Sequence, residues 1–142
     1  MAKRIRLRDR QLPRYCKGEE IMNMVTHIVG GAFGIAALVL CVWRSLLGDD
    51  PWALAGSIIY GVSMIALYTM SSVYHGLRPG MAKKVLQILD HCTIYFLIAG
   101  TYTVIAMSAL RRLSPALCYG ILAVEWGLTA VAVTLTAIDL KK

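Results

Sequence analysis

The sequence predicts an all-α protein, a polytopic bundle of transmembrane helices with four spans. Hydrophobic residues make up 58% of the 142 residues and charged residues 16%, whereas a soluble domain of this length is less apolar and more charged. The apolar residues form long blocks without a 3.6-residue or alternating pattern, which is typical of membrane spans. We therefore expect one transmembrane domain over 18–142, preceded by a basic tail over 1–17.

The tail over 1–17 resembles the basic region of a signal peptide. The apolar run that follows is too long for one and ends without a small-residue cleavage site. We interpret these residues as a cytoplasmic tail that also contacts anionic lipid headgroups. Its seven basic side chains are Lys3, Arg4, Arg6, Arg8, Arg10, Arg14 and Lys17.

The first two predicted spans cover 24–47 and 52–74. At about 1.5 Å rise per residue, each is long enough to cross a bilayer core of roughly 30 Å. Gly30 and Gly34 form a small-x-x-x-small pattern in the first span, which allows another helix to approach closely. A turn over 48–51 ends the first helix, and Trp52 suits the membrane interface that follows it.

The third and fourth predicted spans cover 91–110 and 115–138. The amphipathic segment 81–90 predicts an interfacial turn or two that leads into the third span. Residues 101–103 (Thr-Tyr-Thr) are interpreted as hydrogen-bonding groups between helices. Pro115 suits the first turn of the fourth span.

Basic residues predict the orientation of the four spans. Because loops alternate between the two sides, the N-terminal tail, the 76–90 loop and the C-terminus share one side, with twelve basic residues. The other side has three, which are Arg44, Arg111 and Arg112. The excess places the N-terminus in the cytoplasm of a multi-pass cell-membrane protein.

This topology brings most polar residues of the spans to the cytoplasmic end. Glu19, Asn23 and His27 are spaced i, i+4, i+8, which stacks their side chains along one helix face. Ser71, His75, Asp90 and His91 fall at the same end. Glu125 is the exception, about ten residues into span four, where it is neutral, pairs with a neighbouring helix, or serves transport.

A cluster of histidine, carboxylate and hydroxyl groups at one depth suggests a zinc site. The alternative to a zinc site is that these groups only form hydrogen bonds between helices and to lipid headgroups. Asp90 either orients a ligand and holds a water, or caps the third span. Ser71 and His75 have the spacing of a nucleophile pair but lack an oxyanion element. Basic and aromatic residues do not alternate in the sequence, so nucleic-acid binding is not indicated.

The chain from about Gly18 onward resembles the haemolysin III family, the bacterial branch of the progestin and adipoQ receptor superfamily. The matching segments are Gly18-Glu19-Glu20-Ile21-x-Asn23-x-x-Thr26-His27, Ser71-x-x-x-His75, Leu89-Asp90-His91-x-x-Ile94-Tyr95 and Leu97–Thr103. The family often has a proline directly after the last of these segments. This chain has Val104 there, a difference that affects helix shape.

The resemblance implies seven transmembrane helices and a cytoplasm-side zinc site. His75 would be a zinc ligand, Asp90 would hold the metal-bound water, and Ser71 would support the site. The family's other two ligands are histidines of the seventh helix, which this four-span chain lacks. We therefore expect a fragment or truncated reading frame with an incomplete site, unless His27 or another chain contributes.

The resemblance also implies the candidate functions. The first is a zinc-dependent hydrolase that acts on a lipid amide or ester, with the truncated chain itself inactive. The alternatives are a pore-forming, cytolytic membrane protein and a regulator of membrane state without chemistry of its own. Membrane lipids are the expected partners, and a homo-oligomer is left open.

Overall fold

The computed structural model describes residues 6–138, and all their regular structure is helical. Four long helices are joined by short links. The basic residues at positions 3, 4, 141 and 142 lie outside the described residues. The elements are η1 (Leu7–Asp9), α1 (Lys17–Leu47), α2 (Pro51–Gly76), α3 (Met81–Ile105), the π-helical turn η2 (Ala106–Leu110), α4 (Arg111–Leu113) and α5 (Pro115–Ile138).

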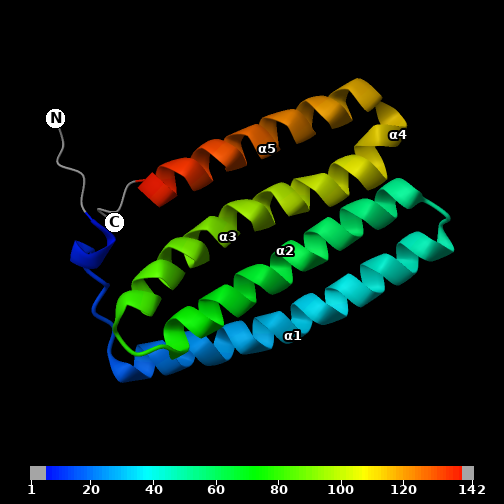
Figure 1. Ribbon diagram of the computed structural model, residues 1–142. Coiled ribbons are helices and arrows are strands. Elements are labelled where there is room, and N and C mark those ends of the chain that lie inside the picture. The colour runs from blue at the N-terminus through cyan, green and yellow to red at the C-terminus, as the bar shows by residue number, and fades with distance from the viewer. Residues whose placement is uncertain (1–5, 139–142) are drawn as a thin grey trace.

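The long helices run antiparallel in a row, in the order α1, α2, α3, α5 (Figure 1). Among the described helices, α1 packs along α2, and α5 packs along α3 and the adjoining η2. The start of α1, the link between α2 and α3, and the end of α5 share one end of the row. We call this end the His75 end, and the opposite end, which holds the α1–α2 link and α4, the Asp50 end.

Each of four helical segments is long and apolar enough to cross a membrane. They cover 17–47, 51–76, 81–113 and 115–138, so the expectation of a four-span all-α membrane bundle is confirmed. Large apolar side chains point outward, as Phe33 and Leu47 do with 71% and 69% of their surface exposed. In a bilayer these side chains face lipid, because hydrocarbon gives no reason to bury them.

The amphipathic segment predicted over 81–90 is helical and forms the first part of α3. Its polar side chains face the protein, since Lys83 and Gln87 are only 3% and 2% exposed. Met81 and Val85, from the apolar face, are 52% and 39% exposed. The segment is amphipathic as expected, but its polar face points inward, because partners for buried polar groups lie between helices and not in lipid.

Small residues bring neighbouring helices close together. A Cβ atom added at Gly30 would lie 2.5 Å from the Tyr68 ring of α2. One added at Gly56 would lie 3.0 Å from the Val104 Cα atom of α3. Only glycine fits such contacts without a shift of side chain or backbone, as small-residue packing in membranes requires.

A hydrogen bond between side chains fastens α5 to α3. Trp126 Nε1 donates to Thr103 Oγ1 over 3.0 Å, while the same hydroxyl donates to the Ala99 carbonyl over 2.7 Å. Thr103 is 1% exposed. The prediction that the Thr-Tyr-Thr run bonds between helices is therefore confirmed at Thr103.

Candidate functional site

The local structure at the start of α1 separates two neighbouring carboxylates. Glu19 Oε2 accepts a hydrogen bond from the Cys16 backbone N–H over 2.7 Å, and Cys16 Sγ accepts one from the Glu19 backbone N–H over 3.4 Å. This reciprocal cap holds Glu19 at the exposed helix start. Glu20, about 100° further round the helix, faces α2 and α3 instead.

Glu20 joins three helices through its two carboxylate oxygens. His75 Nδ1 of α2 donates to Glu20 Oε2 over 2.7 Å, and Lys83 Nζ of α3 donates to Glu20 Oε1 over 2.6 Å. The side chains of His75 and Lys83 are 8% and 4% exposed. We call Glu20, His75 and Lys83 the Glu20 cluster.

The contact with Glu20 indicates which nitrogen of His75 carries a proton. A carboxylate only accepts hydrogen bonds, so the contact places a proton on His75 Nδ1. In the Nδ1–H tautomer the lone pair of the ring is on Nε2, the form in which histidine binds metals.

Aromatic rings surround His75. The ring centroid of Tyr74 lies 4.8 Å from that of His75, and that of Tyr15 lies 5.7 Å away. The Lys83 ammonium group lies 5.0 Å from the Tyr74 centroid, a cation–π contact that adds to its pairing with Glu20. The imidazole is thus fixed by a hydrogen bond on one edge and by rings beside it.

His27 is the predicted site residue that the structure brings to His75. The two rings are stacked with centroids 6.0 Å apart. His27 Nδ1 donates to the Asn23 backbone carbonyl over 2.6 Å, so in its neutral form it also carries a lone pair on Nε2. Asn23 thus acts at this site through its backbone.

The remaining predicted residues make no side-chain hydrogen bond or ring contact with this pair of histidines within residues 6–138. Ser71 is buried one turn before His75 on α2, and Asp90 is half-buried on α3. Glu125 is half-buried on α5, the helix at the far edge of the row. Among residues 6–138, no three histidine, cysteine, aspartate or glutamate side chains gather closely enough to hold a metal ion.

The N-terminal segment covers the His75 end. Arg10, which is 3% exposed, donates from Nε to Gln87 Oε1 over 2.7 Å, and Lys84 Nζ donates to the Arg8 carbonyl. A cavity of about 390 Å³ remains between this segment and the helices. Its lining includes Tyr15, Glu20, Met24, His75 and Lys83.

Sequence reasoning missed Glu20 and Lys83, although the pattern contained a signal for both. Glu20 stands at i−3 and i−7 from Asn23 and His27, a spacing that shares a helix face as well as Glu19 does. Lys83 and Gln87 are one turn apart, and Asp90 follows at i+7 from Lys83. This stripe on α3 marks the face that turns inward.

Comparison with known proteins settles the family. The family model described as haemolysin-III related matches residues 15–142. The chain belongs to the haemolysin III family. It is 36% identical over 110 residues to the hemolysin-3 homolog of Bacillus subtilis (strain 168), covering 78% of this chain and 50% of that relative.

Two further relatives extend the comparison. Hemolysin-3 of Bacillus cereus is 37% identical over 110 residues, covering 78% of this chain and 49% of the relative. The monocyte to macrophage differentiation factor of Homo sapiens is 33% identical over 105 residues, covering 68% and 41%. The chain thus spans about half the length of the haemolysin III relatives it matches. No solved structure shows significant similarity to it.

Proposed function

We propose that this haemolysin III protein is a zinc-dependent lipid hydrolase of the cell membrane in which His75 supplies one zinc ligand. The observation that carries the proposal is the contact between His75 Nδ1 and Glu20 Oε2, 2.7 Å long. A carboxylate on the far nitrogen of a metal-binding histidine orients the ring and raises its basicity. That arrangement leaves His75 Nε2 available to a metal.

The described residues fit part of a zinc site and not a whole one. They provide the imidazole of His75, its carboxylate partner and the neighbouring imidazole of His27, whereas zinc takes four ligands. We infer that the other ligands come from protein outside residues 6–138 or from a second copy. The relatives, about twice as long as the matched region, have room for them.

The residues of this chain would divide the work as follows. Glu20 fixes the tautomer of His75, and Lys83 keeps the carboxylate ionised. Asp90, at the same end, would take up a proton during hydrolysis, and Ser71 would support the helix turn that presents His75. When bound, the metal would act as a Lewis acid on the carbonyl of a lipid ester or amide.

The proposed orientation places the His75 end in the cytoplasm. The basic N-terminal segment, the α2–α3 link and the end of α5 meet at this end (Figure 1), and basic residues favour the cytoplasmic side. Cys16 is exposed there. In Cys41→Ser, which removes the half-buried thiol at the opposite end, a membrane-impermeant maleimide should label Cys16 only after cells are broken, and labelling in intact cells would reverse the orientation.

The metal proposal is tested by measuring zinc in the purified full-length protein. We expect about one zinc per chain for the wild type, and a loss of most of it in His75→Ala, because zinc sites rarely tolerate the loss of a ligand. His91→Ala is the matched control, since His91 is half-buried on α3 and has no part in the proposal.

Equal zinc in wild type and His75→Ala would reject the assignment. A second outcome would separate the two parts of the proposal. If His75→Ala lost its zinc but the wild type did not hydrolyse lipid esters or amides, the metal site would be supported and the hydrolase activity rejected. The regulator of membrane state would then be the better description.

A further inference from the structure

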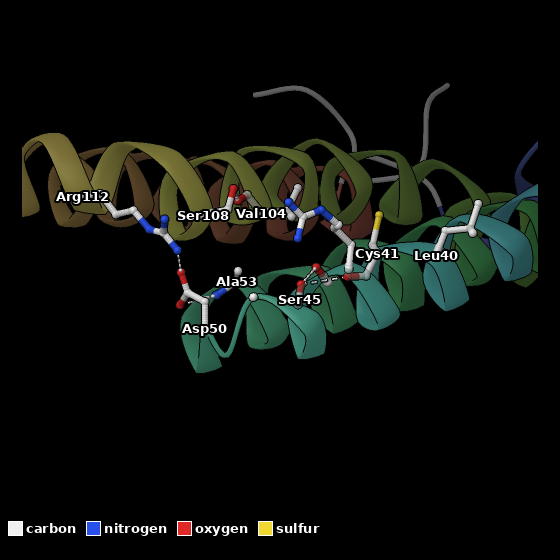
Figure 2. A pocket seen from close by; sticks show the side chains of 11 residues that line it. Leu40, Cys41, Ser45, Asp50, Ala53, Val104, Ser108 and Arg112 are labelled. Atoms are coloured by element: carbon white, nitrogen blue, oxygen red, sulfur yellow. Dashed lines mark hydrogen bonds and ion pairs between the residues drawn. The ribbon is translucent and has the colours of Figure 1, made fainter.

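A second polar cavity lies at the opposite end of the bundle, far from the Glu20 cluster. It has a volume of about 440 Å³ and opens between the end of α1, the start of α2 and the end of α3 (Figure 2). We call it the Asp50 cavity. Its lining residues are Leu40, Cys41, Arg44, Ser45, Gly48, Asp50, Ala53, Ser57, Val104, Ser108 and Arg112.

The carboxylate of the cavity is already fully engaged. Asp50 caps α2, accepting the backbone N–H groups of Trp52 and Ala53 over 3.1 and 3.2 Å. It also accepts Arg112 Nη2 over 2.7 Å and Arg111 Nη2 over 3.3 Å, and Figure 2 shows the pairing with Arg112. Two guanidinium groups and a helix start therefore share one negative charge.

Arg44 lines the same cavity and is left without an acidic partner. Within residues 6–138 no carboxylate lies within ion-pair distance of it. The hydroxyl hydrogens nearby are also committed, because Ser45 Oγ donates to the Cys41 carbonyl over 2.8 Å and Ser57 Oγ lies 3.0 Å from Ser45 Oγ. The cavity thus has excess positive charge and free guanidinium donors.

Two exposed tryptophans near the cavity favour a position at the depth of lipid headgroups. Trp43 and Trp52 are 60% and 42% exposed beside it, and exposed tryptophans favour the membrane–water interface. On the side toward the middle of the helices its wall is apolar, formed by Leu40 and Val104. A ligand with an anionic head and an apolar body matches both walls.

We propose that the Asp50 cavity binds a phosphate group, that of an anionic lipid headgroup, with Arg44 as its main contact. Guanidinium groups bind phosphate oxygens through paired, charge-assisted hydrogen bonds. Free phosphate has the same chemistry, so the experiment has to distinguish the two sources. The proposal is independent of the zinc site at the His75 end.

The test compares lipid retention by full-length protein reconstituted with phosphatidylglycerol and phosphatidylcholine and then examined by native mass spectrometry. The wild type should retain phosphatidylglycerol in preference to phosphatidylcholine. Arg44→Gln should lower that retention about tenfold, the cost of one charge-assisted hydrogen-bond contact. Arg14→Gln removes the same charge from an exposed position at the other end and should retain lipid like the wild type.

Three outcomes would overturn the proposal. Equal retention by wild type and Arg44→Gln would show that Arg44 does not bind the lipid. Equal retention of the two lipids would show that the charge of the headgroup is not recognised. The third is an Arg44-dependent rise in melting temperature with inorganic phosphate but no retained lipid, which would replace the lipid by free phosphate. Because Arg44 makes no ion pair in residues 6–138, its substitution should leave folding intact.

Discussion

At each end of the bundle, basic groups surround one carboxylate, but the local charges are matched differently. At the His75 end, Glu20 pairs with one ammonium group and with the Nδ1–H group of one imidazole. At the Asp50 end, Asp50 pairs with two guanidinium groups, and Arg44 stands nearby without an acidic partner in residues 6–138. The charges of Glu20 and Lys83 thus match within the Glu20 cluster, whereas Arg44 at the Asp50 cavity has no acidic partner within residues 6–138.

The cations that pair with the two carboxylates differ in burial. The Lys83 side chain is 4% exposed, whereas that of Arg112 is 64% exposed. A buried charge must be matched because its desolvation is costly, while an exposed charge stays hydrated. This contrast agrees with the two proposals, a metal at His75 Nε2 and an anion at Arg44.

The largest effect on stability should come from a substitution that removes the carboxylate of the Glu20 cluster. Glu20→Ala leaves the buried ammonium group of Lys83 without an anionic partner, with the Leu77 carbonyl 3.0 Å away and the Tyr74 ring beside it, and removes the acceptor for His75 Nδ1. We expect a loss of about 3 kcal/mol in the free energy of unfolding, typical of removing one partner from a buried pair. Unfolding in mixed detergent micelles measures it.

Glu19→Ala is the matched control. It removes the neighbouring carboxylate, whose interaction is a helix cap and not a contact within the buried cluster. Its cost should be about 1 kcal/mol. If the two variants lost equal stability, the contrast between a buried cluster and an exposed cap would be wrong.

A smaller effect should appear when Asp50 is titrated with acid. The hydrogen bond from Arg112, with those from the Ala53 and Trp52 backbone, holds the pKa of Asp50 below its usual value near 3.8. A lowered pKa means that the ionised carboxylate stabilises the fold at neutral pH, and that this contribution is lost as the pH falls below about 4.

Melting temperatures of wild type and Asp50→Asn between pH 3 and pH 6 test this directly. The difference in melting temperature between the two proteins should become smaller as the pH falls, because the asparagine side chain of the variant does not titrate. A constant gap across the range would show that Asp50 contributes through its cap alone and not through its charge.

The spans were predictable from the sequence because long apolar blocks leave few alternatives to a membrane helix. The inward orientation of the polar face of α3 could not be predicted in the same way. An amphipathic pattern does not tell whether the polar side of a helix contacts water or protein. Lys83 and Gln87 belong to the protein interior since Glu20 and Arg10 lie opposite them. Those partners are more than sixty residues away in the chain.

The candidate site was predictable in part for a similar reason. Topology placed His27 and His75 at one end, and the structure stacks their rings. The choice between Glu19 and Glu20 depended on where α1 begins, which is Lys17 and not the start of the apolar run at Met24. The pairing of Asp50 with the two arginines of α4 joins segments about sixty residues apart, which no local pattern indicates.

The most direct test of the account is the zinc affinity of full-length Glu20→Gln, measured by competition with a chelator. Glutamine keeps the size of the side chain but weakens the acceptor on His75 Nδ1, so affinity should fall about 10- to 100-fold, as for other carboxylate partners of metal-binding histidines. Glu19→Gln should bind zinc like the wild type. Unchanged affinity in Glu20→Gln would contradict the claim that the Glu20 cluster prepares His75 to bind a metal.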